Sequence, residues 1–195
     1  VTFLFVALLG FTVATKICVS FSSNIIPALL FTKSIAFLYW WFSVTYGLGI
    51  KIDEIYEYDV DTALELLDDY CKNADFVFNL AGVNRPKNTE EFMQGNFGFA
   101  STLLDSLKSH GNKCPIMLSS SIQATLIGRY ADGEYGKSKK AGEELFFNYE
   151  NDTGAKVCVY RFPNLFGKWC RPNYNSAVAT FCNNIANDLP ITVND

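Results

Sequence analysis

Residues 75–83, Asp-Phe-Val-Phe-Asn-Leu-Ala-Gly-Val, decide the fold class of this chain. The first six form an apolar run with little polar alternation, which is typical of a strand buried on both faces of a parallel sheet. The small residues that follow let a ligand approach the backbone closely, although such residues also serve in tight turns. We therefore predict a buried strand over Asp75–Leu80 that ends at a candidate binding edge.

Strands and helices alternate on both sides of this strand. The patterns predict further strands over Ile55–Val60, Pro115–Leu118 and Lys156–Phe162, and helices over Asp61–Cys71, Asn88–His110, Tyr135–Tyr149 and Ala177–Ala186. Strands joined by helices of this length imply right-handed crossovers, and hence an α/β fold with a parallel sheet and helices on both faces. Ligands bind beyond the carboxyl ends of the strands in such a sheet, so functional residues are expected there.

The composition excludes several classes of function. A net charge of −4 disfavours binding to nucleic acid or to an anionic membrane, because both need a basic face. An anionic substrate remains compatible, since a few cations and backbone N–H groups hold a phosphate. The six cysteines form no C-x-x-C pair and His110 is the one histidine, so no metal site is predicted. Free thiols in a reducing cytoplasm are the favoured interpretation.

The chain changes composition near residue 50. Residues 1–50 contain no acidic residue and two charges, Lys16 and Lys33. The apolar run Val1–Ala14 is shorter than the roughly 20 residues that a membrane span needs. Two interpretations of this anomalous segment stay open: a membrane anchor, or a stretch outside the native coding sequence that arose from a frame error or a misjoined gene fragment. Residues 51–195 are predicted to form a partial enzyme domain.

A tyrosine and a lysine at the start of one predicted helix carry the candidate chemistry. Lys139 follows Tyr135 by four positions, which places the phenol and the ammonium on one face of the helix, one turn apart. A nearby ammonium lowers the pKa of a phenol and prepares it for acid–base work. A solvated helix face is the alternative. The serine triplet 119–121, which precedes the pair at the end of a strand, favours catalysis.

Two asparagines are further candidates. Asn96 falls between Phe92 and Phe99 on the apolar stripe of its helix, and a buried asparagine must be paired. It is expected to bond the backbone of an adjacent strand and shape a cofactor cleft, or to serve structure alone. Asn164 follows Pro163 at the end of the last predicted strand, where it orients a ligand or satisfies local backbone groups.

Five ordered motifs carry a resemblance to a known family. They are N-L-A-G-V at 79–83, Asn96 in its helix, S-S-S at 119–121, Y-G-K-S-K at 135–139 and R-F-P-N-L-F-G at 161–167. Residues from about Ile55 to Asp195 resemble the extended short-chain dehydrogenase/reductases, the NAD-dependent epimerase/dehydratase group. The resemblance implies a Rossmann-like doubly wound sheet. The family's T-G-x-x-G-x-x-G turn is missing from residues 1–50, so the sheet is expected to be incomplete, with the first βα unit replaced and a C-terminal part beyond Asp195.

The resemblance also implies roles for individual residues. Tyr135 is expected to be the general acid, Lys139 to lower its pKa and hold the nicotinamide ribose, and Ser121 to bond the keto oxygen. The cofactor, NADP or NAD, is expected to contact Asp59, Leu80, Ala81, Gly82, Val83, Asn96 and Pro163. The substrate is expected to contact Ser121, with Ser120 the next choice, and Arg85, Asn164 and Arg171. An acid at position 59 suits the free 2′-hydroxyl of NAD.

Longer stretches narrow the expected activity. N-L-A-G-V-N-R-P, L-S-S-S-I-Q-A-T and the run from Tyr160 to Ser176 look like the reductases of capsular polysaccharide synthesis, in which a metal-binding cupin domain follows the reductase domain. This implies NAD(P)-dependent reduction of a 4-keto nucleotide sugar (UDP-2-acetamido-2,6-dideoxy-hexos-4-ulose type) by a cytoplasmic, homodimeric parent enzyme. The alternatives are a sugar-nucleotide 4-epimerase, a 4,6-dehydratase and an inactive membrane-anchored binding module. Ile122-Gln123 stands where dehydratases carry an acidic pair, which counts against that alternative.

Overall fold

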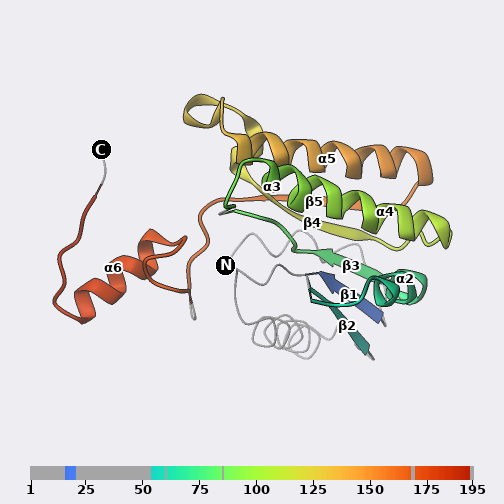
Figure 1. The fold of residues 1–195 in the computed structure, drawn as a ribbon, viewed down its shortest axis with the longest axis horizontal. Helices are drawn as coiled ribbons and strands as arrows, with labels where there is room; N and C mark the ends of the chain where they lie inside the picture. Colours follow the sequence, from blue (N-terminus) through green and yellow to red (C-terminus); the bar gives the residue numbers. More distant parts are fainter. Residues whose placement is uncertain (1–15, 21–53, 60, 85, 168–169, 194–195) are drawn as a thin grey trace, which may run out of the picture. The chain divides into compact units, whose positions relative to one another are not determined.

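The computed structural model describes residues 16–20, 54–59, 61–84, 86–167 and 170–193. The chain divides into two compact units, Val1–Arg161 and Phe162–Asp195, which are described separately. The first unit is built on a five-stranded sheet (Figure 1).

The order of the strands in the sheet is β2-β1-β3-β4-β5. Their bounds are β1 Lys16–Ser20, β2 Glu54–Tyr58, β3 Phe76–Asn79, β4 Ile116–Ser121 and β5 Val157–Phe162. The first four strands pair in parallel, and the amide of Ile116 donates to the carbonyl of Lys156 at 2.9 Å where β5 joins β4. The predicted parallel sheet is confirmed. β4 extends through the serine triplet, which therefore belongs to the strand itself.

The sheet contains one strand that sequence patterns did not predict. No element was assigned to residues 1–50, yet Lys16–Ser20 forms β1 between β2 and β3. Ile17 stands opposite Ile55 of β2 and opposite Phe76 of β3. The residues on both sides of this short strand are apolar as well, so no periodic pattern marks the strand in the sequence. The two interpretations of the segment concern residues that, apart from β1, lie outside the described ones.

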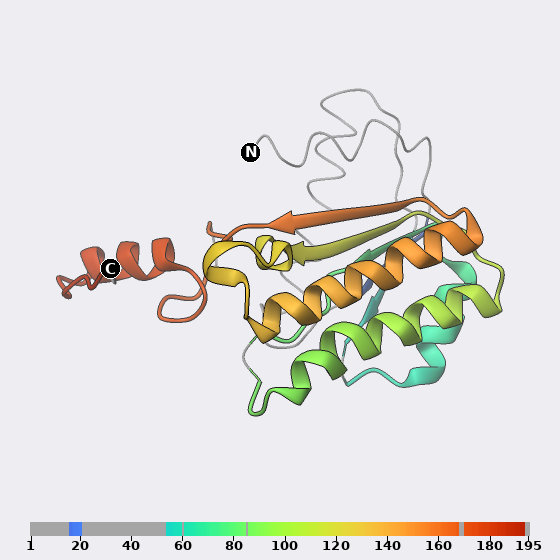
Figure 2. The same cartoon turned by 90° about the horizontal axis from the view of Figure 1, so that it is seen from above.

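The described helices of the first unit lie on one face of the sheet (Figure 2). They are α2 (Leu64–Asn73), α3 (Glu90–Met93) with α4 (Phe99–Ser109), and α5 (Glu134–Thr153). Right-handed crossovers that proceed in one direction along a sheet place their helices on the same face, and β2, β3, β4 and β5 follow each other in one direction. The expected second layer depends on the connection from β1 to β2, residues 21–53, which is outside the described residues.

The core lies between this helical layer and the sheet. α4 buries Ala100, Leu103, Leu104 and Leu107, the spacing of a helix with one apolar stripe. Val77 of β3, Ile116 of β4 and the α5 residues Phe146 and Tyr149 complete the cluster. A π-helical turn, Gln94–Gly98, connects α3 to α4 and contains buried Asn96. Such turns occur frequently at functional sites.

Asn112 joins four elements at the amino edge of the sheet. Its Nδ2 donates to the carbonyls of Cys71 and Ala74 at 2.7 and 2.8 Å, and its Oδ1 accepts from the amide of Cys114 at 2.9 Å. Its own carbonyl accepts from the Tyr149 hydroxyl at 2.8 Å. The ends of α2, α4 and α5 and the start of β4 are thereby fixed together.

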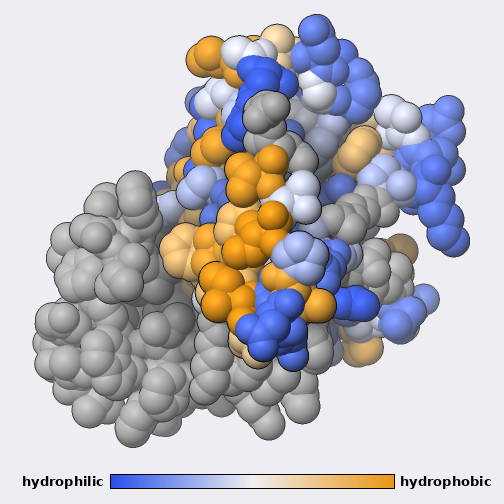
Figure 3. All heavy atoms as spheres, turned by 90° about the vertical axis from the view of Figure 1, so that its left-hand side faces the viewer, coloured by the Kyte–Doolittle hydropathy of each residue, from blue (hydrophilic) through white to orange (hydrophobic). Residues whose placement is uncertain are grey.

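The second unit contains α6, Ala177–Ala186, whose predicted bounds are confirmed. Ser176 accepts a hydrogen bond from the amide of Ala179 at 3.2 Å and so caps the helix. This unit exposes many large apolar side chains, namely Leu165, Phe166, Val178, Ile185, Leu189, Ile191 and Val193. Figure 3 faces the side on which Figure 1 draws α6, and hydrophobic residues are exposed there beside polar ones.

Membrane-spanning helices and metal sites are two features that relate to the predicted classes of function. Among the described residues, no helix has both the length and the apolar character that a membrane crossing requires. The same residues contain no group of three or more His, Cys, Asp or Glu side chains arranged to hold a metal ion.

Candidate active site

The carboxyl ends of the strands collect most of the predicted site residues at one edge of the first unit (Figure 1). Asp59 follows β2 directly, residues 80–83 follow β3, and Ser121 is the last residue of β4. Because the paired strands are parallel, these positions share an edge. The parallel strands therefore place these predicted site residues along the carboxyl edge of the sheet, where they were expected.

Three side chains meet at this edge. Tyr135 lies in the first turn of α5 and Lys139 in the next, with the Lys139 Nζ 5.9 Å from the centroid of the Tyr135 ring. The Ser121 side chain lies near enough to the Tyr135 phenol to influence its pKa. Lys139 is 8% exposed, and its Nζ donates to the Ser119 carbonyl at 3.3 Å. The structure thus brings together the phenol, the ammonium and the hydroxyl that the sequence singles out.

Burial governs how the phenol and the ammonium titrate. It raises the pKa of Tyr135 above the usual tyrosine value, and the Ser121 side chain opposes that change. The Tyr135 pKa lies above the usual value because loss of water around the phenol is the largest effect on it. The expected lowering of this pKa by Lys139 stays a prediction. Burial also lowers the pKa of Lys139 to about 8, and Glu143 opposes this. At neutral pH the phenol is protonated and the amine is charged.

Gly82 makes close contact between the strand-end loop and α5. A Cβ at this position would lie 2.6 Å from Lys139 Nζ and 2.8 Å from Asn96 Oδ1. Side-chain atoms do not approach so closely, so this backbone reaches the ammonium only with glycine. The small residues predicted to admit a ligand therefore also make room for Lys139.

Asn96 fixes the same loop to α5. Its Oδ1 accepts from the Val83 amide and its Nδ2 donates to the Val83 carbonyl, both at 3.0 Å. The Nδ2 also donates to the Ser138 hydroxyl at 3.0 Å, and that hydroxyl donates to the Tyr135 carbonyl at 2.9 Å. The predicted bond from Asn96 to the backbone of a neighbouring strand end is present, although a role in cofactor binding stays a prediction.

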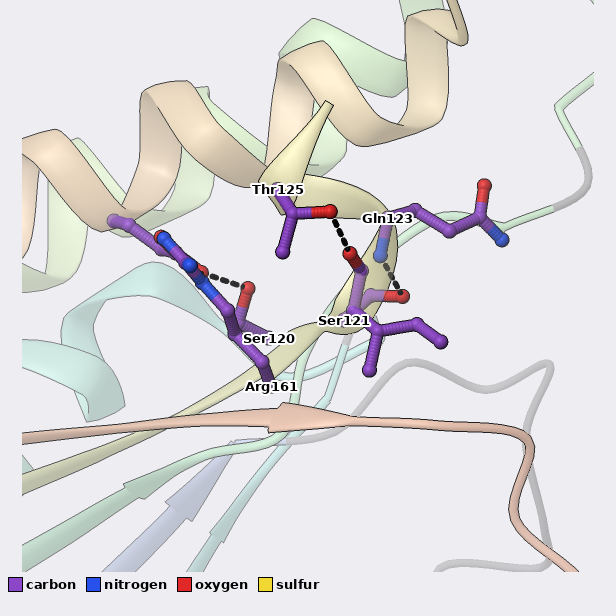
Figure 4. A network of polar contacts seen from close by, with 7 residues as sticks. Ser120, Ser121, Gln123, Thr125 and Arg161 are labelled. Atoms are coloured by element: carbon purple, nitrogen blue, oxygen red, sulfur yellow. Dashed lines mark hydrogen bonds and ion pairs between the residues drawn. The ribbon is translucent and has the colours of Figure 1, made fainter. Parts of the chain in front are cut away.

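The two serines proposed for the substrate point in opposite directions (Figure 4). Successive side chains of a strand alternate between its faces. Ser120 is buried and donates to Glu143 Oε1 at 2.5 Å, whereas the Ser121 hydroxyl accepts from the Gln123 amide at 3.3 Å. Since Ser120 is held by Glu143, Ser121 is the better candidate for a substrate contact, and that contact stays a prediction.

Glu143 and Arg161 lie next to these residues, and the sequence patterns predicted a role for neither. Arg161 Nε donates to Glu143 Oε1 at 2.9 Å, and its Nη2 donates to Oε2 at 2.6 Å. Glu143 is 1% exposed. The spacing of Glu143 could have indicated its place, since Tyr135, Lys139 and Glu143 follow each other at intervals of four positions along one face of α5.

The remaining predicted residues lie elsewhere. The amide of Asp59 donates to the Thr62 hydroxyl at 3.0 Å, so the residue begins the turn into α2. Arg85 lies outside the described residues. Pro163, Asn164 and Arg171 belong to the second unit and are exposed there, with Arg171 stacked 5.8 Å over the Tyr174 ring. Their predicted contacts with cofactor and substrate stay predictions.

Comparisons with known proteins agree with the motifs. The family model "NAD dependent epimerase/dehydratase family" matches residues 42–195. The UDP-2-acetamido-2,6-beta-L-arabino-hexul-4-ose reductase of Pseudomonas aeruginosa is 44% identical over 142 residues, which are 73% of this chain and 37% of that protein.

Solved structures give the same picture. The capsular polysaccharide assembling protein CapF from Staphylococcus aureus aligns with a TM-score of 0.66 and 39% identity, over 91% of this chain and 44% of CapF. The UDP-glucuronic acid 4-epimerase from Bacillus cereus, solved with NAD, aligns with a TM-score of 0.64 and 17% identity, over 91% of this chain and 66% of the epimerase. That last likeness concerns the fold alone. The chain spans less than half the length of the P. aeruginosa and S. aureus proteins.

Proposed function

Since the chain belongs to the NAD dependent epimerase/dehydratase family, we propose that it carries the catalytic residues of an enzyme that reduces the 4-keto group of a nucleotide sugar with NADPH or NADH. The observation that carries this proposal is the placement of Tyr135, at the start of α5, beside the buried ammonium of Lys139 and near Ser121 at the end of β4. The name of the P. aeruginosa relative, a hexul-4-ose reductase, supports reduction over the other reactions of the family.

The nicotinamide side of the site has hydrogen-bond donors of the kind that a dinucleotide needs. Among the described residues Lys139 donates one hydrogen bond, to Ser119, and an ammonium carries three donors. Two donors are thus left for the ribose hydroxyls. The Gly82 backbone packs against this ammonium and the Asn96 side chain. Leu80, Ala81 and Val83 would line the cofactor through their backbone, with Asn96 holding their loop in place.

The adenosine side is assigned to Asp59. It stands at the carboxyl end of β2, where a carboxylate accepts a hydrogen bond from a free ribose 2′-hydroxyl and repels a 2′-phosphate. This favours NAD, while the reductase relatives leave NADP as the alternative. Pro163 is proposed to complete the cofactor contacts.

The protonation states suit a reduction. The bound nicotinamide supplies the hydride. Tyr135 holds a proton at neutral pH, because burial raises its pKa, and gives that proton to the C4 oxygen of the sugar. Ser121 donates a hydrogen bond to the same oxygen. The Lys139 ammonium stabilises the phenolate that remains after the proton has moved.

The substrate is proposed to be a UDP-sugar, as in the reductase named above. Asn164, Arg85 and Arg171 are the candidates for its diphosphate, since guanidinium groups bind phosphate oxygens in pairs. The description of CapF as a capsular polysaccharide assembling protein supports a role in capsular polysaccharide synthesis, which draws on nucleotide sugars in the cytoplasm. The homodimer expected for the parent enzyme stays a prediction.

The experiment compares three forms of the full natural protein that carries this chain: wild type, Tyr135→Phe, and Tyr130→Phe as the matched control. Tyr130 lies in a turn outside the site and bonds Arg129. Oxidation of NADPH or NADH is followed with a UDP-4-keto sugar. We expect Tyr135→Phe to lower kcat by about 10²–10⁴-fold with unchanged cofactor affinity, which is the usual weight of a general acid.

Other outcomes decide between the alternatives. Unchanged turnover in Tyr135→Phe refutes the mechanism. Interconversion of two UDP-sugars without net oxidation of the reduced cofactor identifies a 4-epimerase instead. Loss of water from a UDP-hexose identifies a dehydratase.

A further inference from the structure

Glu143 is a buried carboxylate one helical turn beyond Lys139. Tyr135, Lys139 and Glu143 are spaced by four residues, so all three lie on the side of α5 that faces the sheet. A carboxylate that is 1% exposed must be paired and hydrogen-bonded to remain ionised. The mechanism proposed above does not use this group.

Two neighbouring strands hold the carboxylate in one orientation. From β5, Arg161 forms a two-pronged ion pair with both Glu143 oxygens, at 2.9 and 2.6 Å. From β4, Ser120 donates its hydroxyl to Oε1 at 2.5 Å, and Figure 4 shows Ser120 and Arg161 turned toward the same point. Paired donors in a fixed fork leave the carboxylate little freedom.

The charge of this carboxylate acts on Lys139. The groups around Lys139 are Tyr135 and Glu143 of α5, the Ser119 carbonyl of β4, Gly82 of the loop after β3, and Asn96 of the π-helical turn. Among the described residues, Glu143 is the one ionised group that affects the Lys139 ammonium, and it opposes the effect of burial. Arg161 partly neutralises the same carboxylate.

We propose that Glu143 is a positioning residue, which keeps Lys139 charged beside Tyr135 and, through Ser120, fixes the end of β4 that presents Ser121. The inference rests on the function proposed above, because Lys139 must be an ammonium to hold the ribose and to stabilise the phenolate. Arg161 sets the strength of the effect by sharing the charge of Glu143.

Two variants of the full natural protein test this, and they should act in opposite directions. Glu143→Gln keeps the shape of the side chain and removes its charge, so Lys139 should lose its proton at lower pH. Arg161→Gln leaves Glu143 ionised without its cationic partner, so Lys139 should lose its proton at higher pH. Damage to the fold alone would move both variants in the same direction.

The direct readout is the protonation of Lys139. An amine-reactive acylating reagent is applied over a range of pH without cofactor or substrate, and labelling of the Lys139 peptide is quantified by mass spectrometry. The midpoint of labelling should fall in Glu143→Gln and rise in Arg161→Gln. Lys140, the exposed neighbour, should label identically in all forms. In the kinetic assay the alkaline limb of kcat/KM should move with the Lys139 midpoint.

Midpoints that stay unchanged, or that move in the same direction, overturn the inference. If Glu143→Gln does not fold, Arg161→Gln decides alone: a higher midpoint supports the role of Glu143, and an unchanged or lower one refutes it. Failure of the proposed function is distinguishable, since it requires Tyr135→Phe to remain active. If Tyr135→Phe is inactive but the midpoints of Lys139 labelling do not change in the other two variants, only the positioning role of Glu143 is refuted.

Discussion

The backbone of Gly82 lies against the ammonium of Lys139, so closely that a Cβ on the glycine would stand 2.6 Å from Nζ. The contact joins the loop after β3 to α5. It holds the proposed nicotinamide-binding amine beside the loop that is proposed to line the same cofactor.

The first prediction follows from this contact. In Gly82→Ala the added methyl displaces Lys139 or Asn96, so affinity for the reduced cofactor should fall by roughly tenfold to a hundredfold, as expected for misplaced binding groups. Fluorescence titration with NADPH and NADH measures it. Gly98→Ala is the matched control, because its Cβ would meet nothing nearer than the Met93 carbonyl at 4.0 Å. Equal affinities in both variants contradict the prediction.

Asn96 gives a prediction about stability. Asn96→Ala leaves the amide and carbonyl of Val83 without their partner, and it also removes the bond to Ser138. We expect the free energy of unfolding to fall by about 1–3 kcal/mol, the cost of buried groups left unpaired. Urea denaturation measures this. Asn88→Ala, which removes a single exposed bond to the Glu91 amide, should cost less. A larger loss of stability in Asn88→Ala than in Asn96→Ala would argue against this role of Asn96.

Lys139 links stability to pH. Its pKa in the folded protein is about 8, against an ordinary value of 10.5, so the folded state binds this proton more weakly than the unfolded chain does. The contribution of Lys139 therefore makes stability rise between about pH 8 and 10.5, and the burial of the charged amine costs stability below pH 8.

Replacement of this amine should reveal that cost. Lys139→Met should be more stable than wild type at pH 7, by at most about 3 kcal/mol, and should lose the rise at alkaline pH and the activity. Urea denaturation at neutral and alkaline pH measures both. Lys140→Met, one residue along and exposed, should change neither. Lower stability of Lys139→Met at pH 7 would show that the buried charge is fully compensated.

Much of the fold and the site could be predicted from local sequence. The buried strands have apolar runs, and Tyr135, Lys139 and Ser121 belong to motifs whose spacing has a geometric meaning. β1 could not be predicted, because five residues within a long apolar segment have no distinguishing period. The pKa of Tyr135 depends on burial beneath neighbours such as Phe92, 5.7 Å away between ring centroids, and spacing does not show burial.

Glu143 was missed for a different reason. An acidic residue on a helix resembles a solvated one until its partner is known, and Arg161 is distant in sequence. The choice between Ser120 and Ser121 likewise required the phase of β4, since adjacent serines look the same in sequence and face opposite sides in the strand. Long-range pairing and strand phase are the two properties that local patterns do not contain.

Asn112 provides a prediction that separates structure from catalysis. Its side chain bonds Cys71, Ala74 and Cys114 at the amino edge of the sheet, whereas the site lies at the carboxyl edge. Asn112→Ala leaves two carbonyls and one amide unpaired, so the free energy of unfolding should fall by about 1–3 kcal/mol or more. Because the Asn112 side chain bonds no residue of the site, the NADPH or NADH affinity of the folded fraction should be unchanged. Asn148→Ala, on the exposed side of α5, is the control and should change neither quantity. Cofactor affinity that falls in step with stability would mean that the amino edge also shapes the site, and the separation of the two edges would have to be abandoned.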